Sequence, residues 1–74
     1  MKKRKFTFIQ NGNTEIWNGE DIIDNANYII QTMDCYNDDE VYNNYMLKYN
    51  EQDLKSAIDI INNSLVDFEL DEIV

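Results

Sequence analysis

The Asn11-Gly12-Asn13 tripeptide constrains the fold most, because it stands between two short segments in which side chains alternate. Residues 5–10 alternate Phe6 and Phe8 with β-branched neighbours, and residues 14–17 continue with strand-forming side chains. Asn-Gly is a strong signal for a tight turn between antiparallel strands, since both residues tolerate a positive φ. The pattern therefore predicts a β-hairpin at the start of the chain.

Two segments with apolar side chains at helical spacing follow the hairpin. Asn18 is expected to cap a first helix that runs from about Glu20 to Met33. Asn50 is expected to cap a second helix that ends near Asn63, with Asp53 in the N3 position of a capping box. The two predicted apolar stripes are Ile22, Ile23, Ala26, Ile30 and Met33, and Leu54, Ala57, Ile58, Ile61 and Leu65. Their spacing predicts two helices that pack on one sheet.

The remaining segments complete the expected architecture. Residues 41–49 fit a strand or a helix, and their aromatic and β-branched side chains favour a strand. In residues 66–70 apolar side chains alternate with acids, which predicts a half-buried final strand or an acidic tail that rests on the core. We therefore expect a single α+β domain over residues 1–74, with a basic end at 1–5 and an acidic end at 66–74. Its small, mainly antiparallel sheet has the hairpin plus one or two further strands, in the order ββαβα(β).

The charges of this chain are strongly segregated. It has 6 Lys and Arg residues against 15 Asp and Glu residues, a formal net charge of −9. Residues 2–5 hold most of the cations, and Lys48 and Lys55 are the others. An acidic body repels nucleic acids and membrane headgroups and attracts basic protein surfaces. The basic start is expected to pair with carboxylates of the same chain or to serve as a solubilising end.

Residues that most enzymes need are missing from the sequence. It contains no His, and its only glycines, Gly12 and Gly19, do not form a phosphate-binding loop. Cys35 is a single cysteine without a His partner, so we expect a small buried side chain in a reducing cytoplasm. No apolar run is long enough to span a bilayer. The sequence predicts a non-enzymatic protein without cofactor or metal, located in the cytoplasm of a host bacterium.

Some of the acids have no expected role in folding. Carboxylates in the first turn of a helix are stabilised by the helix dipole, whereas these acids lie outside such positions. They form one group of Asp34, Asp38, Asp39 and Glu40 and a second group of Asp67, Glu69, Asp71 and Glu72. On a strand, Asp67, Glu69 and Asp71 would project from one face about 6.5–7 Å apart. Such a row is similar to the regular charges of a nucleic-acid backbone.

Tyrosines flank the first acidic group, and Tyr36, Tyr42 and Tyr45 are candidate partner contacts. A tyrosine ring buries a large area while its hydroxyl keeps a polar partner, so tyrosines beside carboxylates suit a protein interface. The alternative is that some of them fill the core. Trp17 is expected to anchor the core beneath the hairpin.

In its size, acidity and Asn- and Tyr-rich composition, the chain resembles small phage-encoded anti-defence proteins, which include anti-CRISPR proteins and other DNA mimics. The resemblance concerns general character, and no motif carries over family residues. It implies a stoichiometric inhibitor that binds the basic nucleic-acid-binding surface of a host nuclease, as a monomer or dimer, without binding nucleic acid or membrane. The alternative is a small interaction module, such as an antitoxin or regulatory subunit, that binds through an apolar, Tyr-rich face.

Overall fold

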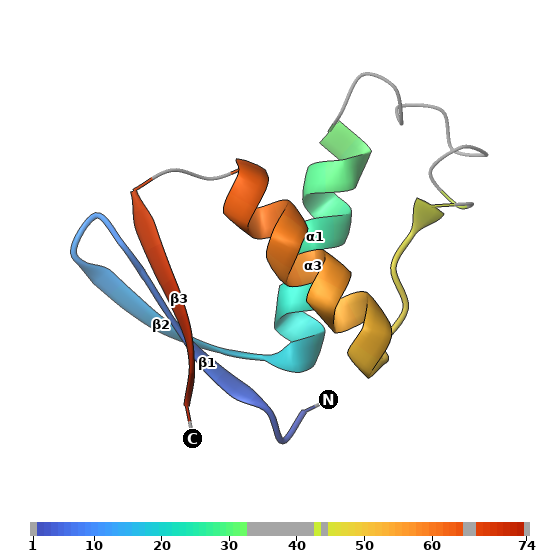
Figure 1. The fold of residues 1–74 in the computed structure, drawn as a ribbon. Coiled ribbons are helices and arrows are strands. Elements are labelled where there is room, and N and C mark those ends of the chain that lie inside the picture. Colours follow the sequence, from blue (N-terminus) through green and yellow to red (C-terminus); the bar gives the residue numbers. More distant parts are fainter. Residues whose placement is uncertain (1, 33–42, 44, 65–66, 74) are drawn as a thin grey trace.

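The computed structural model describes residues 2–32, 43, 45–64 and 67–73. Within them the chain forms strand β1 (Lys5–Gln10), strand β2 (Asn13–Asn18), helix α1 (Gly19–Thr32), helix α3 (Glu51–Ser64) and strand β3 (Phe68–Ile73). The expected α+β class, with a small antiparallel sheet and two helices, is confirmed (Figure 1).

The sheet begins with the predicted hairpin. Asn11 and Gly12 have φ values of 54° and 79°, so both turn residues adopt the left-handed conformation that matches the twist of a tight hairpin. Strand β3 pairs antiparallel with the other side of β1, which gives the strand order β2-β1-β3. Phe6 in the central strand therefore lies opposite Trp17 of β2 and Glu72 of β3.

The core lies between the helices and one face of the sheet. Its buried apolar side chains are Phe6, Phe8, Ile22, Ile23, Ala26, Ile30, Leu54, Ala57 and Ile61. Phe8 stacks on Trp17 with ring centroids 4.2 Å apart and contacts the ring of Phe68 on its other side. Both predicted helical stripes are thus confirmed within the described residues, and Trp17 packs against the core as expected. Met33 and Leu65 lie outside the described residues.

Both helices begin at the predicted caps. At α1, Asp21 N donates to Asn18 Oδ1 at 2.8 Å and Asn18 N donates to Asp21 Oδ2 at 2.9 Å, a reciprocal capping box. At α3, Asp53 N donates to Asn50 Oδ1 at 2.7 Å, which confirms the cap. The Asp53 carboxylate accepts a hydrogen bond from Lys48 N instead of from Asn50 N. This cap therefore also fixes the backbone that precedes the helix.

The prediction of a strand at 41–49 is wrong for the residues that the structure describes. Asn43 and Tyr45 are helical, and residues 46–48 belong to no strand. The reason is that the backbone of Leu47 is bound by a side chain of α1. Asn27 Oδ1 accepts from Leu47 N at 2.8 Å, and Asn27 Nδ2 donates to Leu47 O at 3.1 Å. This tertiary contact overrides the strand preference of the local side chains.

Candidate functional site: two exposed surfaces

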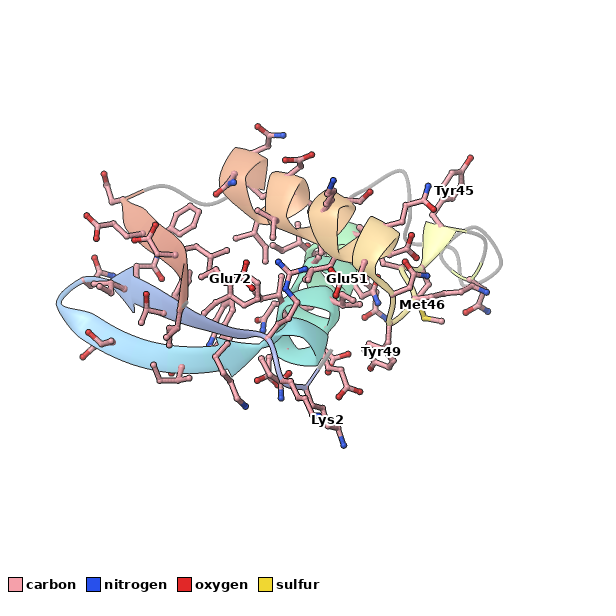
Figure 2. All side chains as sticks on the ribbon, turned by 60° about the horizontal axis from the view of Figure 1, so that its bottom comes forward. Lys2, Tyr45, Met46, Tyr49, Glu51 and Glu72 are labelled. Atoms are coloured by element: carbon pink, nitrogen blue, oxygen red, sulfur yellow. The ribbon has the colours of Figure 1, made fainter. Side chains whose placement is uncertain are left out.

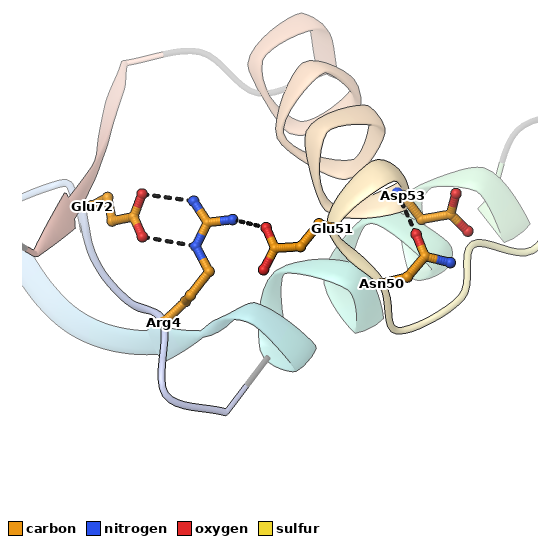
Figure 3. A network of polar contacts seen from close by, with 5 residues as sticks. All are labelled: Arg4, Asn50, Glu51, Asp53 and Glu72. Carbon is orange, nitrogen blue, oxygen red and sulfur yellow. Dashed lines mark hydrogen bonds and ion pairs between the residues drawn. The ribbon is translucent and has the colours of Figure 1, made fainter.

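Arg4 joins three parts of the fold and neutralises two acids. Its Nε and Nη2 atoms donate to the two carboxylate oxygens of Glu72 at 2.8 and 2.7 Å (Figure 3). Its Nη1 atom donates to Glu51 at the start of α3, and its guanidinium lies 5.5 Å from the ring centroid of Phe6. Arg4 thereby connects the beginning of β1 to β3 and to α3. The hydrogen bond from Arg4 lowers the pKa of Glu72, and the two carboxylates raise the pKa of Arg4.

The basic N-terminal segment therefore pairs with carboxylates of the same chain, which is one of the two roles that the sequence predicted for it. Lys2 Nζ lies 4.0 Å from Glu20 Oε2, which adds a looser contact at the start of α1. Glu72 was a candidate for partner binding, but its carboxylate is occupied by Arg4 in this fold. The sequence contains no local sign of this pairing, because Arg4 and Glu72 are 68 positions apart.

Most described carboxylates are engaged within the molecule. Beyond the Arg4 and Lys2 contacts, Glu15 accepts from the Trp17 indole, Asp21 and Asp53 bind backbone amides, and Asp24 accepts from the Tyr49 hydroxyl. Within the described residues, the carboxylates that make no hydrogen bond or ion pair are Asp59, Asp67, Glu69 and Asp71. Three of these four lie in β3 or directly before it. The acids that folding leaves unused are therefore concentrated at one strand.

The geometry of this acidic strand differs in part from the prediction. Asp67 has a φ of 56° and precedes β3, so it does not continue the row of strand side chains. Glu69 and Asp71 are both exposed and share one face of β3, where the strand rise places alternate residues about 6.5–7 Å apart. Phe68 and Leu70 point to the other face and pack against the core. The expected row of three acids is reduced to two.

Glu69 and Asp71 belong to the face of the sheet that is turned away from the helices, which we call the open sheet face. The strand register places Ile9 beside Glu69 and Thr7 beside Asp71 in the same rows. Ile16 of β2 completes the row of Thr7, and its side chain is 57 % exposed. This surface combines a pair of carboxylates with exposed apolar area. That composition suits a partner that presents both basic and apolar side chains.

A second surface lies at the end of the molecule opposite the hairpin (Figure 2). The exposed side chains of Tyr28, Met46 and Tyr49 line one hollow there, and we call them the tyrosine surface. Of the predicted tyrosine contacts, Tyr45 is exposed but does not line this hollow, whereas Tyr36 and Tyr42 lie outside the described residues, as do Asp34, Asp38, Asp39 and Glu40. Sequence reasoning missed Tyr28 as a surface residue. Because Tyr28 lies off the apolar stripe of α1, the sequence pattern itself indicates that its side chain is exposed.

The described residues contain no group of three or more metal-ligating side chains. In the same residues, no helix is long and apolar enough to cross a membrane. Comparisons of the chain with protein-family models, with curated proteins and with solved structures found no match.

Proposed function

We propose that this protein is a stoichiometric inhibitor that binds the basic nucleic-acid-binding surface of a host defence nuclease, such as a CRISPR-Cas effector, in the bacterial cytoplasm. It would do so by placing carboxylates at positions where the nuclease binds the phosphates of nucleic acid. It would need no catalytic chemistry, cofactor, nucleic acid or membrane. In this proposal the protein is not an enzyme, and its effect comes from occupying the surface that DNA would use.

The observation that carries the proposal is the separation of used from unused acids. The only arginine, Arg4, binds carboxylates of the same chain, and most described carboxylates have a partner within the protein. The unused acids Asp67, Glu69 and Asp71 gather around β3. Neighbouring like charges repel each other and stabilise nothing within the fold, so a basic partner supplies a reason for them. Glu69 and Asp71, about 6.5–7 Å apart on one strand, form a short row of negative charge of the kind that a phosphate backbone presents to its binding proteins.

A second candidate function is supported by the tyrosine surface. Tyr28 is 68 % exposed and Tyr49 is 55 % exposed, and exposed aromatic side chains that gather in one place are typical of protein interfaces. A small interaction module, such as an antitoxin or regulatory subunit, would bind mainly through this surface. In that case the acids of β3 would serve solubility only.

The experiment that tests the proposal is capture of partners from a bacterial lysate at low salt, followed by elution with a salt gradient and mass spectrometry. The proposal expects one basic nuclease or nucleic-acid-binding protein, released at moderate salt because exposed charge pairs are screened. A neutral or acidic partner that remains bound at high salt would contradict it. Such a partner would favour the interaction module.

A matched pair of single substitutions then locates the contact. Asp71→Asn and Asp59→Asn remove the same charge from exposed carboxylates without an internal partner, one in β3 and one in α3. We expect the double variant Glu69→Gln/Asp71→Asn to slow association with the captured protein about tenfold. Asp71→Asn alone should slow it by a smaller factor, and Asp59→Asn should leave it nearly unchanged. Equal effects of Asp71→Asn and Asp59→Asn would mean that net charge, and not β3, attracts the partner.

A further inference from the structure

A hollow with a volume of about 460 Å³ lies between α1 and the segment 46–49. Asp24, Tyr28 and Gln31 line it from α1, and Met46, Lys48 and Tyr49 line it from the opposite side. The three α1 residues are spaced four and then three positions apart, so they form one stripe along the helix. The hollow is thus built into the tyrosine surface.

The walls of the hollow are fixed by hydrogen bonds. The side chain of Asn27, which is only 8 % exposed, binds both backbone polar groups of Leu47. The next backbone amide, Lys48 N, donates to Asp53 Oδ2 at 2.7 Å, which ties the same segment to the start of α3. The Tyr49 hydroxyl donates to Asp24 Oδ1 at 2.5 Å and closes the contact with α1. A binding site whose walls are preformed loses little conformational entropy on binding.

The side chains of the hollow suit a planar cation. Asp24 supplies a carboxylate that uses one oxygen for Tyr49 and has capacity for further donors. Tyr28 and Tyr49 supply aromatic rings, on which a guanidinium stacks favourably, and Met46 supplies a polarisable apolar wall. The Gln31 amide oxygen is a further acceptor for N–H groups. Carboxylate, ring faces and amide together match the donors and the flat shape of arginine.

We propose that this hollow receives an arginine side chain of the protein's basic partner. The proposal rests on the proposed function, because a nucleic-acid-binding surface is rich in arginine. It adds a specific anchor on the tyrosine surface to the diffuse attraction of β3. Arginine fits better than lysine, since lysine is a compact, strongly hydrated charge without a face to stack. Lys48 also lines the hollow, and its charge opposes any cation there.

The direct test uses the whole protein, labelled with ¹⁵N, and titrates it with N-acetyl-arginine methylamide in amide NMR spectra. We expect saturable shifts confined to residues that line the hollow, with a dissociation constant on the order of 10 mM. The matched probes are N-acetyl-lysine methylamide, expected to bind at least about threefold more weakly, and uncharged N-acetyl-norleucine methylamide, expected not to saturate. Equal binding of the arginine and lysine probes, or shifts spread over the whole acidic surface, would overturn the proposal.

Variants separate this site from general acidity. Asp24→Asn keeps an acceptor for the Tyr49 hydroxyl but removes the charge, and it should weaken arginine binding about tenfold. Asp59→Asn changes the net charge equally and should have no effect. Tyr28→Ala should weaken binding, whereas Lys48→Gln should strengthen it. An Asp24→Asn variant that is folded by its amide spectrum and binds like Asp59→Asn would refute the site.

The titration with the arginine probe and the capture of a partner from lysate test the two proposals separately. If the probe binds in the hollow but no basic partner is captured from lysate, the arginine site stands and the inhibitor proposal falls. If a basic partner is captured through β3 but the arginine probe does not bind in the hollow, the inhibitor proposal stands without this anchor. Each proposal is therefore decided by its own readout.

Discussion

The hydrogen bonds between Asn27 and Leu47 lead to a quantitative prediction about stability. We expect Asn27→Ala to remove both contacts and leave the Leu47 amide and carbonyl without their partner. Two hydrogen bonds contribute about 1 kcal/mol each, and an abandoned buried polar group costs about 1–3 kcal/mol. Leu47 is only half-buried, so water recovers part of this loss. We therefore predict that the free energy of unfolding falls by about 2 kcal/mol.

That loss is large for a chain of 74 residues, whose total stability is expected to be about 4–11 kcal/mol. The measurement is urea unfolding followed by circular dichroism and by the fluorescence of Trp17. With a slope near 1 kcal/mol per molar urea, the midpoint should fall by about 2 M. The control is Asn25→Ala, because Asn25 is exposed and donates to Asp21 O within the same helix. The control should change stability by less than about 0.5 kcal/mol.

Asn27→Asp refines this prediction through pH. The aspartate can still accept from Leu47 N, but when it is ionised it repels the Leu47 carbonyl and loses hydration. Burial raises the pKa of such a carboxyl in the folded state above its unfolded value. The destabilisation relative to the wild type is therefore present at neutral pH and shrinks as pH falls through the folded pKa, where the protonated carboxyl can donate to Leu47 O. If Asn27→Ala lowers the free energy of unfolding no more than Asn25→Ala does, the Asn27 side chain does not hold the backbone of Leu47 in place and the reasoning is wrong.

Three further predictions concern other parts of the fold. Asn50→Ala removes the cap of α3 and should lower the free energy of unfolding by about 1 kcal/mol in urea titration, and an unchanged midpoint would contradict the cap. Gly12→Ala meets no atom within 4 Å, so its expected cost of about 1–2 kcal/mol comes from the positive φ alone, and Gly12→Asn should cost less. Arg4 lowers the pKa of Glu72 below its usual value of 4.5, so this pairing stabilises the fold fully above that pH and is lost as pH falls through the folded pKa. Arg4→Gln should flatten the acid limb of the stability–pH curve, and a curve of unchanged shape would show that the pairing contributes nothing.

The elements with local signals were predicted well from the sequence. The turn at Gly12, the caps Asn18 and Asn50 and the buried helical stripes all depend on neighbours within a few positions, and all are confirmed. The sequence left open whether the end of the chain forms a final strand or an acidic tail. Only the pairing of β3 with β1 decides for the strand. That pairing joins residues more than 50 positions apart, and sequence spacing gives no direct information on it.

The contacts that the sequence did not reveal share the same physical origin. Residues 46–48 were assigned to a strand because their local propensities do not reveal that Asn27 takes their backbone groups. Glu72 was considered available to a partner because nothing in its neighbourhood shows that Arg4 will reach it. For the same reason the hollow beside Tyr28 could not be foreseen, since it exists only where α1 meets a distant segment. Long-range contacts thus decide which polar side chains remain available for binding.

We propose that this protein occupies a surface that DNA would otherwise use. The most direct measurement is competition between the protein and a fluorescent DNA duplex for the basic protein captured from lysate, followed by anisotropy. We predict mutually exclusive binding, in which one equivalent of the protein releases the duplex and Glu69→Gln/Asp71→Asn requires a clear excess. A stable ternary complex, with the duplex still bound at saturating protein, would contradict the claim.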